Sequence, residues 1–163
     1  MYFRKERYFY IILTVVEILP FALPIVSKKE AYMFRKNFFI CGLTGWCMEI
    51  IFTSIGAFLR DDMRLIGQTS LWMFPIYGLA AFIKPVYAYI KKLPTILRGS
   101  IYTCGIFTCE YITGMLLKKH HLCPWDYSQS PANINGVIRL DYAPFWLLAG
   151  LLFERIVTRK EKD

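Results

Sequence analysis

Apolar residues in this sequence come in long blocks rather than as periodic faces. Five such blocks cover residues 8–26, 38–59, 71–90, 96–117 and 142–157. Each block approaches the roughly 20 residues that an α-helix needs to cross about 30 Å of hydrocarbon. The pattern therefore predicts an all-α fold, a polytopic transmembrane helix bundle with four well-marked spans and a fifth span at the N-terminus.

The first block differs from the others because Glu17, Pro20 and Pro24 interrupt it. No small-residue cleavage site follows it, so we interpret it as a retained span or a re-entrant segment rather than a signal peptide. We expect an N-terminal segment at 1–37 that contains this span, a four-span membrane core at 38–157 and a basic C-terminal tail at 158–163.

Composition and charge support a membrane location. The sequence is 56% hydrophobic and 17% aromatic, which is high for a water-soluble protein. Its formal charge of +8 lies in short clusters between the apolar blocks, so it indicates membrane topology rather than nucleic-acid binding.

One side of the bilayer would hold eleven basic residues: Lys28, Lys29, Arg35, Lys36, Lys91, Lys92, Arg98, Arg155, Arg159, Lys160 and Lys162. The other side would hold eight: Arg4, Lys5, Arg7, Arg60, Arg64, Lys118, Lys119 and Arg139. The positive-inside rule then predicts a multi-pass protein of the cell membrane with an outside N-terminus and a cytoplasmic C-terminus.

Several kinds of chemistry lack their sequence signatures. The sequence has no G-x-x-x-x-G-K-[ST] phosphate loop, no H-E-x-x-H helix and no G-x-S-x-G elbow, so it cannot hydrolyse ATP by a P-loop mechanism. Its five cysteines are odd in number, and four lie in predicted spans, where they behave as small apolar residues. No disulfide framework, cofactor or catalytic residue follows from the sequence.

Glu49 and Glu110 are the main candidates for a polar intramembrane site. Both predicted spans start from the same membrane side, and each glutamate lies about eleven residues in, roughly 16 Å deep. The two carboxylates could meet at mid-membrane and serve as a proton relay, an ion site or a general acid. The alternative is a structural hydrogen bond to a Thr, Tyr or Trp of a neighbouring helix. Small and polar residues flank Glu49 at helical spacing, which favours close helix packing on that face: Gly42, Gly45, Trp46, Thr53 and Gly56.

Other ionisable residues in the apolar blocks have simpler interpretations. Lys84 lies near the end of its span, so we expect its side chain to snorkel to the interface unless it pairs with a glutamate. Glu154 and Arg155 lie close to a span end, and we expect both at the interface.

The longest connection, residues 118–141, mixes aromatic residues with polar turn residues and predicts a compact cap over the bundle. Its candidate binding residues are Trp125, Asp126, Tyr127, Arg139 and Asp141. In the structural alternative, Trp125 and Tyr127 belong to an aromatic belt, and Asp126 caps a turn or accepts a bond from Arg139. His120, His121 and Cys123 offer metal ligands only superficially, because adjacent histidines do not easily converge on one ion. We therefore expect no metal site.

A set of spaced motifs resembles a known family. The motifs lie at 44–49 (TGWCME), 71–78 (LWMFPIYG), 110–114 (EYITG), 123–128 (CPWDYS) and 136–146 (GVIRLDYAPFW). Together they resemble the bacterial ABC transporter permease family called CmpB, which is similar to the animal transmembrane protein 229 family. The resemblance covers about residues 38–155 in order and excludes the first block. It implies a multi-pass bacterial membrane protein that forms a homo-oligomer and recruits a separate ATPase subunit.

Three hypotheses for function follow. The first is a transport-related membrane subunit, with Glu49 and Glu110 lining a polar pathway under the loop around Trp125. The second is a membrane enzyme acting on a lipid or isoprenoid substrate, with Glu110 or Asp126 as acid or base. The third is an accessory or scaffold subunit in which the glutamates matter for stability alone.

Overall fold

The computed structural model describes residues 27–159, and these are mostly helical. The predicted first span, Glu17 and the last four residues of the basic tail lie outside the described residues. In chain order the elements are α2 (Lys28–Phe58), α3 (Met73–Gly78), the 3-10 helix η1 (Leu79–Phe82), α4 (Ile83–Ile90), α5 (Thr95–Lys119), β1 (Asn133–Ile134), β2 (Ile138–Arg139), the 3-10 helix η2 (Leu140–Tyr142) and α6 (Ala143–Thr158).

Helix α2 begins ten residues before the predicted span because a capping box starts it. The Ser27 hydroxyl accepts a hydrogen bond from the Glu30 amide at 3.2 Å, and the Glu30 carboxylate accepts one from the Ser27 amide at 2.9 Å. This reciprocal pair satisfies amide donors that a helix N-terminus otherwise leaves free. The basic residues from Lys28 to Lys36, expected in a connection, are therefore helical. At 31 residues, α2 is about 46 Å long and exceeds the thickness of the hydrocarbon layer.

Helices α3, η1 and α4 follow one another without a break from Met73 to Ile90, and we call this continuous helical segment the rod. Its middle turn is a 3-10 helix. Pro75 lies in the first turn of α3, where a missing amide is tolerated. Pro85 cannot donate to the carbonyl of Ala81, and its ring crowds that carbonyl in a regular α-helix. The 3-10 turn at Leu79–Phe82 lies at this point, so the rod changes its winding where the proline requires it.

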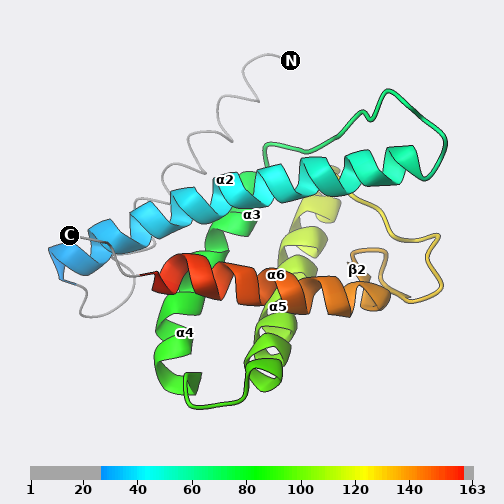
Figure 1. Cartoon of the computed structure of the whole chain (residues 1–163). Helices are drawn as coiled ribbons and strands as arrows, with labels where there is room; N and C mark the ends of the chain where they lie inside the picture. Colours follow the sequence, from blue (N-terminus) through cyan, green and yellow to red (C-terminus); the bar gives the residue numbers. More distant parts are fainter. Residues whose placement is uncertain (1–26, 160–163) are drawn as a thin grey trace.

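Within residues 27–159, four helical segments pack together: α2, the rod α3–α4, α5 and α6. Figure 1 shows α2 and α6 running across the view, while the rod α3–α4 and helix α5 cross them; α2 packs mainly on α3, and α6 packs on α5 and α4. Close approach depends on glycine at two contacts. A Cβ on Gly45 would lie 2.0 Å from Tyr77 Cγ, and a Cβ on Gly150 would lie 2.6 Å from Tyr102 Cβ. The small-residue face predicted around Glu49 is confirmed as a packing face at Gly42 and Gly45.

The interior and exterior are both apolar. The main buried cluster joins all the long helical segments and consists of Cys41, Ile83, Tyr102, Ala149, Phe153 and Val157. Among residues 27–159, two segments, Lys28–Phe58 and Met73–Ile90, are long and apolar enough to cross a membrane by length and composition. Only 22% and 17% of their most apolar windows are buried, so most of the residues in these windows are at least partly exposed.

Candidate functional site

A cavity of about 270 Å³ lies between the rod α3–α4 and helices α5 and α6. Its walls are apolar over most of their length, with Ile76, Ile83, Ile106 and Phe153 among the lining residues. The volume falls near the lower end of the range for ligand pockets, about 300–1,000 Å³. The few polar side chains of the lining are therefore the groups that could orient a bound molecule.

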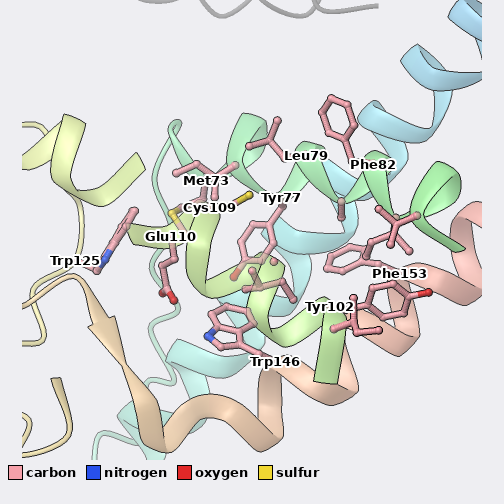
Figure 2. Close-up of a pocket in the computed structure, with 17 residues that line it drawn as sticks. Met73, Tyr77, Leu79, Phe82, Tyr102, Cys109, Glu110, Trp125, Trp146 and Phe153 are labelled. Atoms are coloured by element: carbon pink, nitrogen blue, oxygen red, sulfur yellow. The ribbon is translucent and has the colours of Figure 1, made fainter. Parts of the chain in front are cut away.

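Glu110 supplies the carboxylate at one end of this cavity. The residue is only 8% exposed, and its Oε2 atom has no hydrogen-bond partner within the part of the chain that the structure describes. Figure 2 shows the indole nitrogen of Trp146, from α6, facing this carboxyl group. Trp146 Nε1 is also buried, and it makes no hydrogen bond of normal geometry with any described residue. A buried acceptor and a buried donor thus lie close together with no well-formed hydrogen bond between them, which is costly unless another group completes both.

Aromatic side chains surround the Glu110 carboxylate. The Tyr77 hydroxyl extends toward it from α3 (Figure 2). Trp125 lies on another side, and its ring is held because Nε1 donates to the Val137 carbonyl at 3.0 Å. Both Trp125 and Val137 pack over Gly114 of α5, where any side chain would displace them. The loop at 120–142 therefore closes the Glu110 end of the cavity.

The candidate loop residues Asp126, Arg139 and Asp141 form hydrogen bonds and an ion pair within the loop. Asp126 Oδ1 accepts from the Ser128 hydroxyl at 2.5 Å and from the Ser128 amide at 3.0 Å, and these two bonds lower the pKa of its carboxyl group. Of the two alternatives for Asp126, the turn cap is the one formed. Arg139 pairs instead with Asp141 at 2.8 Å, and this bond lowers the pKa of Asp141. The Arg139 guanidinium also lies over the Tyr142 ring, 4.3 Å from its centroid.

Tyr127, in the loop, lies within electrostatic range of both candidate glutamates. Burial raises the pKa of the Tyr127 phenol, and the charges of Glu110 and Glu49 raise it further. The two carboxyl groups therefore lie within electrostatic reach of one side chain, and Tyr77 is within reach of both as well. A proton or ion shared between Glu49 and Glu110 stays a prediction.

Glu49 itself has a polar partner outside the cavity. Its Oε2 accepts a hydrogen bond from the Thr69 hydroxyl at 2.9 Å. Thr69 belongs to the connection at 59–72, which folds back along α2: Thr53 Oγ1 bonds the Gln68 amide and carbonyl, and Trp46 Nε1 donates to the Ser70 carbonyl. Glu49 thus helps to hold this connection against the helix.

Glu154 lies inside the protein rather than on its surface, and its position at the membrane interface stays a prediction. It is 9% exposed and forms a two-pronged ion pair with Arg98, with Nε to Oε2 at 2.9 Å and Nη2 to Oε1 at 3.0 Å. The Tyr102 hydroxyl donates to the same carboxylate at 2.6 Å. This cluster ties the start of α5 to the end of α6, beyond the cavity end opposite Glu110. The partners are 52 and 56 residues apart in the sequence, so the pairing has no local signal.

The remaining ionisable candidates lie elsewhere. Lys84 Nζ contacts Met33 Sδ at 2.9 Å, on the α2 side of the rod. His120 and His121 are exposed, and the Cys123 thiol donates to the Trp125 carbonyl. Within residues 27–159, no three metal-ligating side chains come together.

Tyr77 and Trp146 are site residues that the sequence reasoning did not select. Both lie within the motifs that carry the family resemblance, Tyr77 at 71–78 and Trp146 at 136–146. The set of motifs could have identified both residues, because Glu110 and Trp125 lie in two other motifs of the same set.

Comparison with known families agrees with the resemblance. The model of the family CmpB, described as "Putative ABC-transporter type IV", matches residues 36–161. The chain belongs to this CmpB family. The match spans all the helices described here except the first turns of α2, and it includes Glu49, Glu110, Tyr77 and Trp146. No solved structure matches the chain.

Proposed function

We propose that this CmpB-family chain is a multi-pass membrane subunit of an ABC-type transport system and that it acts as a permease-type component. The outward-facing apolar surface supports the membrane location. Helix α2 exposes Ile51 and Ile55, α5 exposes Ile112 and Leu116, and α6 exposes Leu148, all at more than half of their full surface. Such surface is unfavourable in water and favourable in lipid. The proposal counts α2, the rod α3–α4, α5 and α6 as four spans and residues 8–26 as a fifth.

The arrangement of helix ends supports the predicted division of the connections between two sides of the membrane. In Figure 1 the starts of α2 and α5 and the ends of α4 and α6 lie toward the left and bottom. The long connections at 59–72 and 120–142 lie toward the top and right. We take the membrane normal to run from the lower left to the upper right of this view. The two groups of basic residues that the sequence assigns to opposite sides then lie at opposite ends of the normal. The C-terminal side, with more Lys and Arg, is then cytoplasmic.

The Glu110 carboxylate inside the apolar cavity is the observation that carries the proposal of a transport role, because its Oε2 atom makes no hydrogen bond of normal geometry with any residue in 27–159. Ionisable groups within the membrane are costly, so they are typical of substrate and ion pathways. Here the carboxylate ends a cavity that three helical segments enclose, and a hydrogen-bonded loop caps that end. We propose Glu110 as the polar contact for cargo, with Trp125 and Tyr127 covering it and Glu49 as a second polar group nearby.

Energy for transport must come from another subunit, since the sequence has no P-loop. The proposal therefore predicts a stoichiometric ATPase in material purified through a tag from gently solubilised native membranes. Quantitative mass spectrometry of the co-purified proteins tests this, with Glu110→Gln as a variant that should keep the ATPase because its change is inside the cavity. Absence of any ATPase, together with a lipid class that accumulates only in Glu110→Gln cells, would favour the membrane-enzyme hypothesis and overturn the transport proposal.

A further inference from the structure

The polar end of the cavity offers one hydrogen-bond acceptor and one donor that face each other. Glu110 Oε2 is the acceptor and Trp146 Nε1 is the donor. Both atoms are buried, and although the indole lies within reach of the carboxylate, neither atom makes a hydrogen bond of normal geometry with a described residue. A hydroxyl group satisfies both at once, because it donates one hydrogen and accepts through its oxygen. An ammonium group can only donate, and a carboxylate can only accept. Either one would leave one of the two protein groups unsatisfied.

The rest of the cavity fits a hydrocarbon chain. Along α5 the lining runs from Glu110 back to Ile101, nine residues or about 13 Å of helix. The volume of about 270 Å³ is small, which suits one chain better than the two chains of a phospholipid. Gly105 lies midway, and a Cβ built on it would meet no atom within 4 Å, so space remains open beside it.

The cavity also has an opening on the outer apolar surface. Val86 of α4 and Ile101 of α5 line the cavity and are 38% and 39% exposed, and Gly105 of α5, another lining residue, is exposed as well. In a membrane this gap between α4 and α5 would face lipid tails. A molecule dissolved in the bilayer could therefore enter sideways without crossing water.

From these three features we propose that the cavity binds a membrane-borne alcohol with a single hydrocarbon chain, its hydroxyl group between Glu110 and Trp146 and its chain directed along α5 toward the opening at Val86. This assignment deepens the proposed function because it names the class of cargo. It requires no ATPase for binding, so the two proposals can fail separately.

The test is competition for photo-cross-linking to the purified chain in detergent. A diazirine-labelled decanol is the reporter, and decanol, decylamine, decanoate and decane are the competitors, so the chain is constant and the head group changes. Decanol should compete at least about tenfold better than the others, which is the effect of one buried hydrogen bond left unmade. Labelled peptides should map to the rod α3–α4, α5 and α6.

Matched variants separate the head-group contact from the chain contact. Glu110→Met and Trp146→Phe should each remove most of the advantage of decanol over decane, while Glu110→Gln, which keeps an acceptor oxygen, should retain it. Gly105→Phe should fill the open space and abolish labelling of these helices. Asp62→Asn changes an exposed ion pair in the connection at 59–72, away from the cavity lining, so it should leave binding unchanged and serves as the control.

Three results would overturn the proposal. Equal competition by all four probes would mean that a water molecule completes the Glu110 and Trp146 pair. Strongest competition by decylamine would mean that the carboxylate pairs with a cation. Unchanged labelling of α5 in Gly105→Phe would place the reporter outside the cavity.

Discussion

Replacing Gly45 by alanine tests the packing of α2 on the rod that carries Tyr77 into the cavity. The new Cβ would lie 2.0 Å from Tyr77 Cγ and 2.3 Å from Tyr77 Cβ. These atoms belong to the base of the side chain, so a rotamer change cannot remove the clash and the backbone of α3 must move. Overpacking of this kind typically costs about 1–3 kcal/mol.

Gly105→Ala is the matched control, because Gly105 is also inside a helix but has open space around its Cβ position. Each substitution gains about 1 kcal/mol of helix propensity, and this gain cancels when the two variants are compared. The remaining difference of about 1–3 kcal/mol corresponds to roughly 2–12 °C in the midpoint of thermal unfolding. Tyrosine and tryptophan fluorescence of the purified protein in detergent measures it. A midpoint for Gly45→Ala equal to or above that of Gly105→Ala would refute the packing of α2 on α3.

Three further predictions concern the ion pairs and the loop. Glu154→Gln should lower the unfolding midpoint more than Asp62→Asn, because the Glu154 pair with its arginine is mostly shielded and the Asp62 pair is largely exposed; equal shifts would contradict the burial of the first pair. Trp125→Phe loses the bond to the Val137 carbonyl, worth about 1 kcal/mol, and should speed proteolytic cleavage within 120–142; an unchanged rate would argue against that bond as the restraint. The pKa of Asp141 is lowered from its ordinary value of 3.8 by its arginine partner, so its contribution is complete above that value and is lost as pH falls below it. Cleavage of the loop by an acid-active protease should therefore be constant from pH 7 to pH 5 and rise only below about pH 4; a rise near pH 6 would assign the order of the loop to a different group.

Most of the helical segments were predictable because the length of an apolar block is visible in the sequence. The predicted block 71–90 became the rod Met73–Ile90, 96–117 became α5 at Thr95–Lys119, and 142–157 became α6 at Ala143–Thr158. The helices begin and end at turn residues such as Pro94 or at the charged residues that border each apolar block. The start of α2 was missed because Lys28 and Lys29 indicated a connection, although Ser27 and Glu30 have the spacing of a capping box.

The site was only partly predictable. Glu110 was selected because a carboxylate within an apolar block is costly, and the structure places it in the cavity. Its neighbours Tyr77 and Trp146 come from other helices, and which face of a helix they occupy depends on packing that one sequence does not reveal. The burial of Glu154 was not predicted for the same reason, since its partner Arg98 lies on a different helix.

The most direct test of the central claim is native mass spectrometry of the chain extracted from its own membranes, comparing the natural sequence with Gly105→Phe. If the cavity holds a membrane-borne molecule, the natural chain should carry one additional mass of a single-chain alcohol, and Gly105→Phe should lack it while still co-purifying with the ATPase. Identical spectra for the two proteins, each without a bound molecule or each with the same one, would contradict the assignment of the Glu110 cavity as the cargo site.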